Sequence, residues 1–415
     1  MSTTINCIFK IEKGCLIAKI IYLYKLRLNN IIFQNIKCIG MQSAPLPSFI
    51  SLKFRYWNFV SMLLVVWVHA YNLKYAYLQP WTVPDEPLTV NSFIQYFTAN
   101  GLARFVIPLL FLISGYLYAL QDNRLYRQRT RKRVRTLLIP YLIWSAIGLL
   151  FTYILELFPY TKQMIAGSHL LQINSNTFLL HQYKWNEWLV RWILFPIPYQ
   201  LWFLLVLFVY NAAYPWLLYC VTNPKAQKIF FPLAILFWLM NLGTPLVEGE
   251  GLLFFSLGIL IQKRNINIKI PGKWLQPIPW FILFLCINSF KTWLAFKGQP
   301  FLGNSVYPTL LLLHKIVVVS ALITCWFGSD KIVQTCMQYP VFRKLTGFAF
   351  IIYAMHVPLL FYVNALLFPL LQSIPNYRLL LFIGLPFTIM LFCIGTGVLL
   401  KKISPLVYAL LMGGR

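Results

Sequence analysis

Two histidines lie inside long apolar stretches of the sequence. His69 follows "FVSMLLVVWV", and His356 follows "GFAFIIYAM", with Tyr353 three residues before it. Ionisable side chains are costly in hydrocarbon and commonly face the interior of a helix bundle, where an imidazole can accept and return a proton. His69 is therefore a candidate general base, and His356 is a candidate second polar group of a central cavity. For each histidine, a packed ring bonded to a nearby carbonyl is the alternative interpretation.

A dense run of cations is the second chemical signal. Residues 123–135, "NRLYRQRTRKRVR", contain seven Lys or Arg side chains directly before an apolar stretch. Closely spaced guanidinium groups such as Arg131, Arg133 and Arg135 suit phosphate oxygens, which favours a site for an anionic head group or a nucleotide. A topology signal or lipid binding explains the same run, and both interpretations remain open.

Other polar residues stand at the ends of apolar stretches. Arg104 opens "RFVIPLLFLISGYLYAL", in which small residues favour close helix packing, and Glu250 opens "EGLLFFSLGI". A carboxylate at a helix start is also stabilised by the free backbone amides there. His314 and Lys315 in "LLLLHKIVV" lie near the end of a stretch, so we expect them to extend to the membrane interface in a structural role.

Familiar catalytic motifs are missing from the sequence. It contains no GxSxG, Walker or HExxH pattern, so a covalent serine mechanism and an ATPase are unsupported. The eight cysteines are scattered without a CxxC pair, which argues against a metal site or a disulfide framework.

The elements that must position these residues are transmembrane helices. The chain has 415 residues, of which 59% are hydrophobic and 11% are charged, and this composition excludes an ordinary soluble domain. Lys and Arg number 36 against 9 Asp and Glu, but the cations lie between apolar blocks. Positive-inside topology explains them, and no nucleic-acid partner is expected.

Apolar blocks of about 20 residues predict an all-α membrane protein with about ten transmembrane helices in one bundle. The cationic loops predict that both termini lie in the cytoplasm. The expected location is the inner (plasma) membrane. The predicted spans are 57–77, 102–121, 136–158, 200–221, 229–246, 249–263, 277–294, 306–327, 346–370 and 379–400.

Two regions fall outside these spans. Residues 1–45 form a poorly defined N-terminal extension, and Met41 is an alternative translation start; the membrane domain is expected over 52–402. The connection 159–199 contains Trp185, Trp188 and Trp192 near one helical face, which favours a helix lying in the membrane interface.

Six segments in order resemble the acyltransferase 3 family of integral membrane acyltransferases. They are "VVWVHA", "RFVIPLLFLISGYL", "RKRVRTLLIPYLIW", "LWFLLVLFV", "EGLLFFSLGI" and "FIIYAMH", and the resemblance covers about residues 52–400. Each segment is short, but their order along a ten-span chain makes a chance likeness improbable.

The resemblance implies a membrane O-acyltransferase. It would move an acetyl, succinyl or other short acyl group from acyl-CoA, a donor substrate and not a bound cofactor, to a hydroxyl of a glycan, exopolysaccharide or lipid-linked sugar. Membrane lipid, acyl-CoA and this acceptor are the expected partners. By the likeness, His69 is the general base or relay, and the substrate-binding residues are Arg104, Arg131, Arg133, Arg135, Glu250 and His356. Tyr353, one turn before His356, is expected to bind substrate with them.

The sequence departs from the family pattern at one catalytic position. Family members usually carry an arginine eleven residues before the first histidine, where this chain has Asn58. Arg55 lies one turn earlier on nearly the same helical face, so Arg55 is the candidate substitute and Asn58 the position in question. Leu205 and Val206 also replace a frequent Arg-Asp pair.

Two alternatives stay open, the first because His69, Arg104, Glu250 and His356 could form a translocation pathway, and the second because of Asn58. One is a transporter or flippase of a lipid-linked glycan or a small anion, which broken helices or inverted repeats would favour. The other is an inactive family member.

Overall fold

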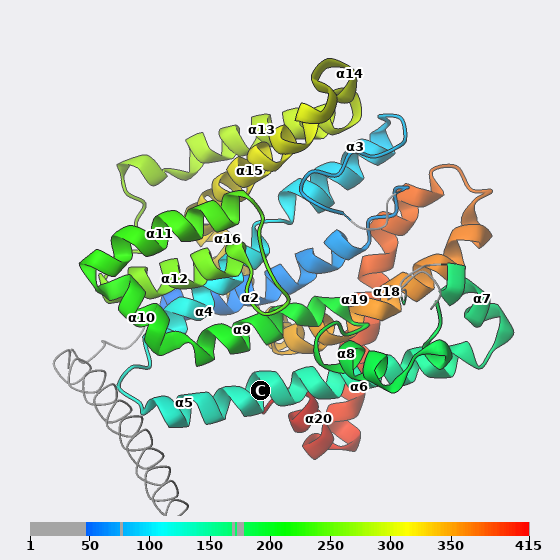
Figure 1. The fold of residues 1–415 in the computed structure, drawn as a ribbon, viewed down its shortest axis with the longest axis horizontal. Coiled ribbons are helices and arrows are strands. Elements are labelled where there is room, and N and C mark those ends of the chain that lie inside the picture. Colours follow the sequence, from blue (N-terminus) through cyan, green and yellow to red (C-terminus); the bar gives the residue numbers. More distant parts are fainter. Residues whose placement is uncertain (1–46, 75–77, 168–170, 172–177, 415) are drawn as a thin grey trace, which may run out of the picture. The chain divides into compact units, whose positions relative to one another are not determined.

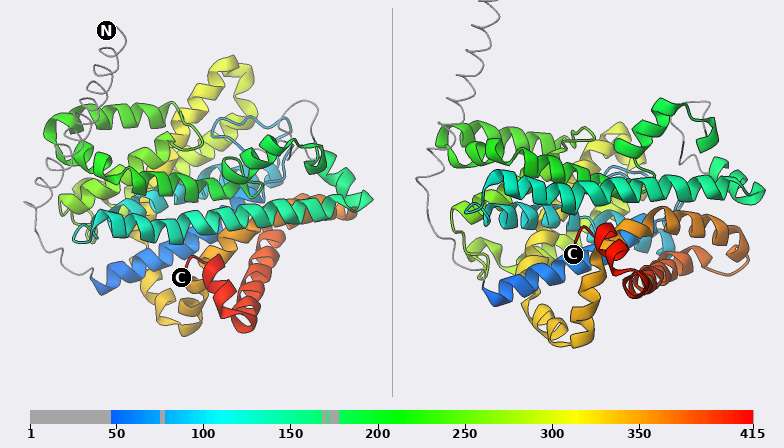
Figure 2. Two further views of the ribbon diagram at one scale, coloured as in Figure 1. Left: turned by 60° about the horizontal axis from the view of Figure 1, so that its bottom comes forward. Right: turned by 90° about the horizontal axis from the view of Figure 1, so that it is seen from below.

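The computed structural model describes residues 47–74, 78–167, 171 and 178–414 (Figures 1 and 2). This part of the chain is built from helices, with one isolated bridge between Gly243 and Glu248. The all-helical fold class is confirmed. The predicted extension 1–45 and the alternative start at Met41 lie outside the described residues.

The helices keep one numbering along the chain. They are α2 (Ser48–His69), α3 (Val90–Phe97), α4 (Val106–Ala119), α5 (Tyr126–Arg133), α6 (Ile139–Glu156), α7 (Pro159–Gly167), α8 (Trp185–Ile193), α9 (Trp202–Ala212), α10 (Tyr214–Thr222), α11 (Pro224–Leu239), α12 (Gly249–Lys263), α13 (Pro277–Lys297), α14 (Gln299–Leu302), α15 (Val306–Gly328), α16 (Asp330–Gln338), α17 (Pro340–Leu345), α18 (Ala349–Leu371), α19 (Tyr377–Ile403) and α20 (Pro405–Leu411). Short turns η1 (Thr98–Leu102), η2 (Val134–Leu138), η4 (Tyr199–Leu201) and η7 (Thr346–Phe348) join some of them.

Seven helices of the described part are long and apolar enough to cross a membrane, and the bent pair α9 and α10 raises the number to eight. The expected count of ten is therefore not confirmed. The fifth and sixth predicted spans correspond to α11 and α12, which have 16 and 15 residues. At 1.5 Å per residue these helices measure only about 24 Å and 22 Å, short of the hydrocarbon thickness.

The predicted span 200–221 is bent by 66° between α9 and α10. Pro215 lies in the first turn of α10, and its ring nitrogen has no hydrogen to donate to the preceding turn. A continuous helix is interrupted at this point.

Helices α4 and α12 lie side by side in the interior (Figure 1). A Cβ atom on Gly115 of α4 would lie 2.0 Å from the Phe255 carbonyl oxygen, and one on Gly258 would lie 2.2 Å from that of Leu112. Only glycine allows this approach, as expected for small residues in packed membrane helices. The glycines thereby fix α4, whose first turn follows Arg104.

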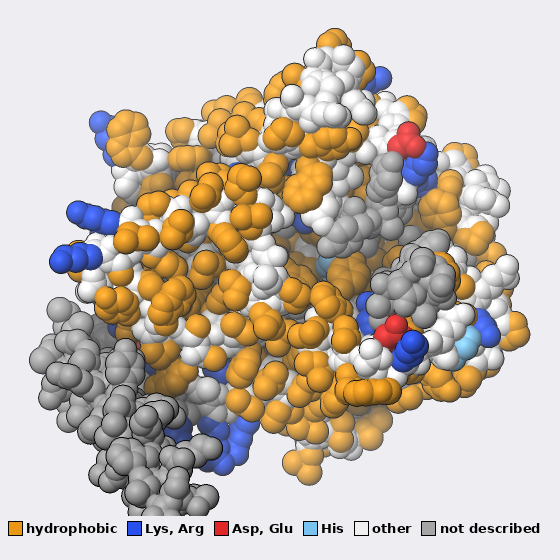
Figure 3. Space-filling view, viewed as in Figure 1, with side chains coloured by type: hydrophobic (Ala, Val, Ile, Leu, Met, Phe, Trp, Pro, Cys, Tyr) orange, Lys and Arg blue, Asp and Glu red, His pale blue; other side chains and the backbone are white. Residues whose placement is uncertain are grey.

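Hydrophobic side chains cover much of the face seen in Figure 3, as expected for contact with lipid. A hollow lies near the centre of that face, with histidine atoms visible at its floor. Helix α8 forms where the tryptophan-rich segment predicted a helix, and Trp192 donates to the Leu142 carbonyl of α6 at 2.9 Å. Its place in the membrane interface stays a prediction. Helix α20 lies beside α6 (Figure 2), where Trp144 donates to the Leu411 carbonyl at 3.0 Å.

Candidate active site

His69 is the last residue of α2, and the residue as a whole is partly exposed. Nδ1 of His69 lies 2.9 Å from the hydroxyl of Tyr199 in η4. The centroid of the His69 ring is 5.2 Å from that of His356 in α18. The two histidines that sequence reasoning singled out, 287 positions apart, are therefore neighbours in the fold.

The hydrogen bonds of His356 fix its tautomer. Its Nδ1 lies 3.0 Å from the Ile352 carbonyl oxygen, which can only accept, so Nδ1 carries the hydrogen. In the neutral ring, Nε2 is then an acceptor. This Nε2 is buried and has no hydrogen-bond partner among the described residues. A buried acceptor without a partner is uncommon and marks a place where a ligand hydroxyl can donate.

A break in α18 forms the wall beside the two histidines. Val357 has non-helical backbone angles (φ −112°, ψ 135°), and Pro358 after it cannot donate to the Ala354 carbonyl one turn earlier. The side-chain amide of Gln200 takes over this role, because Nε2 lies 3.1 Å from the carbonyl oxygens of Tyr353, Ala354 and Val357.

Tyr353 provides a second link between α18 and η4. Its hydroxyl donates to the Gln200 backbone carbonyl at 2.6 Å, and its ring centroid is 6.4 Å from that of His356. Gln200 and Tyr199 are consecutive, so this contact also places the hydroxyl that meets His69. Sequence reasoning missed Tyr199 and Gln200 of η4; the signal was a Tyr-Gln pair shortly before an apolar helix.

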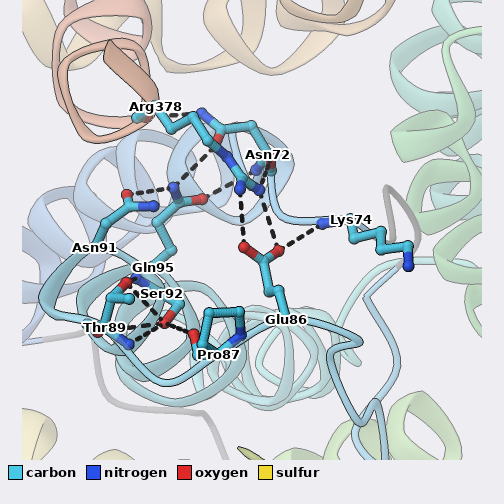
Figure 4. Close-up of polar contacts among 9 residues, drawn as sticks. All are labelled: Asn72, Lys74, Glu86, Pro87, Thr89, Asn91, Ser92, Gln95 and Arg378. Atoms are coloured by element: carbon cyan, nitrogen blue, oxygen red, sulfur yellow. Dashed lines mark hydrogen bonds and ion pairs between the residues drawn. The ribbon is translucent and has the colours of Figure 1, made fainter. Parts of the chain in front are cut away.

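The backbone that follows His69 is held by the polar network of Figure 4. Asn72 and Gln95 exchange two hydrogen bonds, from the Asn72 backbone amide at 3.0 Å and from Gln95 Nε2 at 2.8 Å. Arg378 donates to the Asn72 carbonyl at 2.7 Å and to both carboxylate oxygens of Glu86 at 2.8 and 3.1 Å. The network ties the end of α2 to α3 and α19 and so restricts the position of His69.

Tyr71 lies between His69 and this network. Its hydroxyl is buried without a hydrogen-bond partner among the described residues. Burial raises the pKa of Tyr71 far above its ordinary value, so the hydroxyl stays protonated and is available as a donor. Sequence reasoning gave no role to Tyr71.

Arg104 and Glu250 lie on the side of the site formed by η1 and α12. Arg104 donates to the carbonyls of Ala99 at 3.0 Å and Leu78 at 2.7 Å, and its charge acts on the His69 ring. The Glu250 carboxylate is 3.4 Å from Nε1 of Trp238, and the charge of Arg104 acts on it as well. The charge of Arg104 thus reaches both His69 and Glu250, but no contact joins Glu250 to His69 among the described residues.

Arg55 and Asn58 lie at a different level of α2. Fourteen residues separate Arg55 from His69, which is about 21 Å along a helix. Arg55 donates to the Thr346 hydroxyl and to the Arg343 carbonyl, both at 2.7 Å. Asn58 is exposed, about 16 Å along α2 from His69. The structure thus does not bring either residue to the histidine.

The cationic run is also remote from His69. Its three predicted residues occupy α5 and η2, where Arg131 and Arg135 are exposed and Arg133 lies 5.2 Å from the Tyr118 ring centroid. Tyr118 is near the end of α4, and Arg104 precedes its start, so about 20 Å of helix separates the run from the site.

The expectation for His314 and Lys315 was wrong. Both side chains are buried, with 3% exposure each, and do not extend to an interface. Helix α13 packs against α15 beside His314, whereas Lys315 donates to Asn241, which follows α11. Lys291 of α13, which is fully buried beside His314, was missed as a site residue although it is the lone cation between the apolar segments "FLCINSF" and "TWLAF". Among the described residues, no three His, Cys, Asp or Glu side chains gather as metal ligands would.

Comparison with known proteins identifies the family. A family model described as "Acyltransferase domain" matches residues 54–396, which is most of the chain. The chain belongs to the acyltransferase 3 family. This confirms the family predicted from the sequence motifs.

The acyltransferase 3 protein is 24% identical over 328 residues to the succinoglycan biosynthesis protein ExoH of Rhizobium meliloti (strain 1021), covering 78% of this chain and 82% of that protein. No solved structure matches it. The family match and the apolar helices together show that this protein is a multi-pass membrane acyltransferase.

Proposed function

We propose that this acyltransferase 3 protein transfers a short acyl group from acyl-CoA to a hydroxyl of a glycan, an exopolysaccharide or a lipid-linked sugar. The family supports acyl transfer, and the similarity to a protein named for succinoglycan biosynthesis supports a glycan acceptor. The protein would act in the inner membrane, with ten spans once the short helices α11 and α12 are counted, and with both termini in the cytoplasm.

The contact of His69 with Tyr199 carries the proposal. With Nδ1 of His69 donating to the Tyr199 hydroxyl, Nε2 is free to act as the base. His69 then takes the proton of the acceptor hydroxyl while that oxygen attacks the thioester carbonyl carbon. The tetrahedral intermediate collapses with cleavage of the carbon–sulfur bond. The coenzyme A thiolate leaves and takes the proton from the imidazolium, so His69 returns to its starting state.

The neighbouring His356 would help to hold the acceptor sugar in position. Its unpartnered Nε2 is an acceptor beside the His69 ring and suits a second hydroxyl of the same sugar. Tyr353 holds η4 against α18 and is a positioning residue in this proposal. Arg104 and Glu250 would bind substrate on the α12 side of His69.

The donor phosphates would bind the exposed cations Arg131 and Arg135, together with Arg133. Since about 20 Å of α4 separates these residues from His69, the donor must lie extended between the two regions. Arg55, in the N-terminal half of α2, and Asn58, in its middle, would influence donor binding and not proton transfer.

Transport is the second candidate, because the break in α18 and the bend between α9 and α10 are features of transporter helices. The carbonyls freed by the break in α18 are occupied by Gln200, however, and are not open to an ion. This favours a fixed wall over a moving gate.

Release of free coenzyme A by the purified protein in lipid tests the proposal. We expect wild type to consume acetyl-CoA or succinyl-CoA when a membrane glycan extract is added. His69→Ala should lower the rate at least about 100-fold, because it removes the base. His181→Ala changes an exposed histidine bound to Glu156 and is the matched control, expected to retain the rate. Equal rates for His69→Ala and wild type would exclude His69 as the base. A protein that carries glycan across the bilayer without consuming either donor would be a transporter.

A further inference from the structure

Asp122 stands between α4 and α5, at the start of the cationic run. It is the only acidic residue between Glu86 and Glu156 in the sequence, and seven Lys or Arg side chains follow it within residues 124–135. Partial neutralisation of these cations is the simplest role for a single carboxylate at this position. Its contacts indicate a second role, which is to orient α5.

The Asp122 carboxylate joins three helices. One of its oxygens accepts a hydrogen bond from the Arg129 guanidinium of α5 at 2.6 Å. The other oxygen accepts from the Tyr214 hydroxyl of α10 at 2.7 Å and pairs with Lys263, the last residue of α12. Helices α10 and α12 pack against each other and lie on the left of Figure 1. Asp122 therefore ties the beginning of α5 to this packed pair.

Arg129 is the buried member of the cationic run, with 7% exposure. Besides its bond to Asp122, it donates to the Tyr118 carbonyl at 3.1 Å. Its guanidinium carbon lies 4.6 Å from the Tyr118 ring centroid and 4.8 Å from that of Tyr214. A guanidinium enclosed by two rings and a carboxylate is not open to a phosphate, so Arg129 is an anchor of α5 and not a ligand.

The position of Arg129 sets the rotation of α5. Arg133 follows one turn later on the same face, with its guanidinium carbon 5.2 Å from the Tyr118 ring centroid. This guanidinium is half-buried and makes no hydrogen bond or ion pair among the described residues. The ring covers its flat face, which leaves the N–H edge free for phosphate oxygens. Arg131, two residues after Arg129, lies about 200° around the helix and is exposed.

We propose that Asp122 is a positioning residue of the donor site. It holds Arg129 inward and thereby fixes the rotation of α5. This rotation presents Arg131 and Arg133 to the phosphates of the acyl donor. The inference rests on the proposed function for the nature of the donor, and it divides the cations of the run into an anchor and ligands.

The sign of the effect on donor binding separates positioning from charge. Asp122→Asn removes a negative charge beside several cations, so electrostatics alone would make coenzyme A bind more tightly. Loss of positioning should instead weaken binding. We expect the Kd of coenzyme A, measured by calorimetry with purified protein in nanodiscs, to rise about tenfold, as for the loss of one charge-assisted contact. The KM for acetyl-CoA or succinyl-CoA should rise with it, while kcat should change less than about twofold because the run is remote from His69.

Two further variants show whether the effect is specific to Asp122. Asp122→Glu keeps the carboxylate and should recover most of the lost affinity. Asp85→Asn is the matched control, because it makes the same change in an ion pair whose two side chains are exposed, and it should bind like wild type. If Asp122→Asn does not fold, Asp122→Asn combined with Arg129→Met removes both partners of the buried pair and should show the same loss of affinity. Unchanged or tighter binding by Asp122→Asn, or an equal loss in Asp85→Asn, would overturn the inference.

Adenosine 3′,5′-bisphosphate tests whether the contact is with phosphate. It carries phosphates without the thiol-bearing arm of coenzyme A, and Asp122→Asn should weaken its binding by the same factor. A loss confined to intact coenzyme A would place the effect on that arm and contradict the inference.

These titrations contain no acceptor and are therefore separate from catalysis. Wild type that binds coenzyme A in the Asp122-dependent way but never releases it from an acyl donor would refute the proposed function and leave the role of Asp122 standing. Wild type that turns over acyl-CoA, with a coenzyme A affinity that Asp122→Asn does not weaken, would refute this inference alone. Wild type that binds neither ligand would refute the donor site and the inference together.

Discussion

The two ends of α2 use polar side chains in opposite ways. At the N-terminal end, the buried Lys53 pairs with Asp330 of α16, and Arg55 donates to Thr346 of η7. At the C-terminal end, His69 meets the neutral groups Tyr199 and His356. The first end binds helices together through a fixed charge, whereas the second holds an imidazole whose proton is not bound to a carboxylate.

The N-terminal end of α2 therefore has a structural role, and the C-terminal end has a chemical one. A cation facing a carboxylate keeps its proton and stabilises the packing of its neighbours. An imidazole held by neutral partners can gain and lose a proton without breaking an ion pair. Changes at the first end should therefore alter stability, and changes at the second should alter the rate of acyl transfer.

The largest expected effect is on stability, and it comes from removing the Asp330 charge that pairs with Lys53. The Lys53 side chain is 0% exposed and that of Asp330 is 38% exposed. Asp330→Asn leaves a buried cation without its counter-charge and should lower the free energy of unfolding by about 3 kcal/mol. Lys53→Met leaves a carboxylate that water reaches and should cost about 1 kcal/mol. Denaturant titration in detergent micelles measures both.

Lys74→Met is the control for that measurement. Lys74 and Asp85 form an ion pair in which both side chains are exposed, 59% and 62%. Such pairs contribute about 0.5 kcal/mol or less. A loss from Asp330→Asn no larger than that from Lys74→Met would show that the N-terminal end of α2 does not depend on the ion pair.

A smaller effect is expected at the other end of α2. Tyr199→Phe removes the hydroxyl that orients His69 and should lower kcat/KM about tenfold, or about 1.4 kcal/mol, with an unchanged midpoint of thermal unfolding. Tyr362→Phe deletes a buried hydroxyl bound to Thr152, away from the histidines, and is the matched control. Steady-state release of coenzyme A measures both variants. An equal rate loss in the two would remove the special role of Tyr199.

The smallest effect is expected for Asn58→Arg, which restores the family's usual residue. Asn58 is exposed, about 16 Å along α2 from His69. The added guanidinium should change kcat less than about twofold and act, if anywhere, on the KM for the donor. A gain in kcat of tenfold or more would show that the natural chain is impaired and that the middle of α2 is coupled to His69.

Much of the fold was predictable because apolar length and cationic loops report directly on membrane helices. The helix containing His69 and the one containing His356 were both expected, as was close packing around Gly115. The number of spans was not, because an apolar stretch such as 229–246 does not reveal where its helix ends. Bends are equally hidden: Pro215 interrupts one predicted span, while Pro386 lies inside a continuous α19.

The site was predictable in its isolated residues and not in its contacts. His69 and His356 stood out because each is an ionisable residue in an apolar stretch. Tyr199 and Gln200 did not, since a tyrosine and a glutamine before a helix are ordinary until the break in α18 is seen to need a donor. His314 and Lys315 were misjudged because distance from a span end does not show whether another helix covers that face.

The sequence by itself determined that this protein is an all-helical membrane acyltransferase, because hydrophobicity, charge placement and motif order are properties of the chain alone. The tertiary structure decided which polar groups meet: His69 with Tyr199 and His356, Lys53 with Asp330, and Lys291 with His314. Those pairings depend on which faces of distant helices pack together. Helical periodicity gives the face of each residue, but the packing of all the helices selects its neighbour.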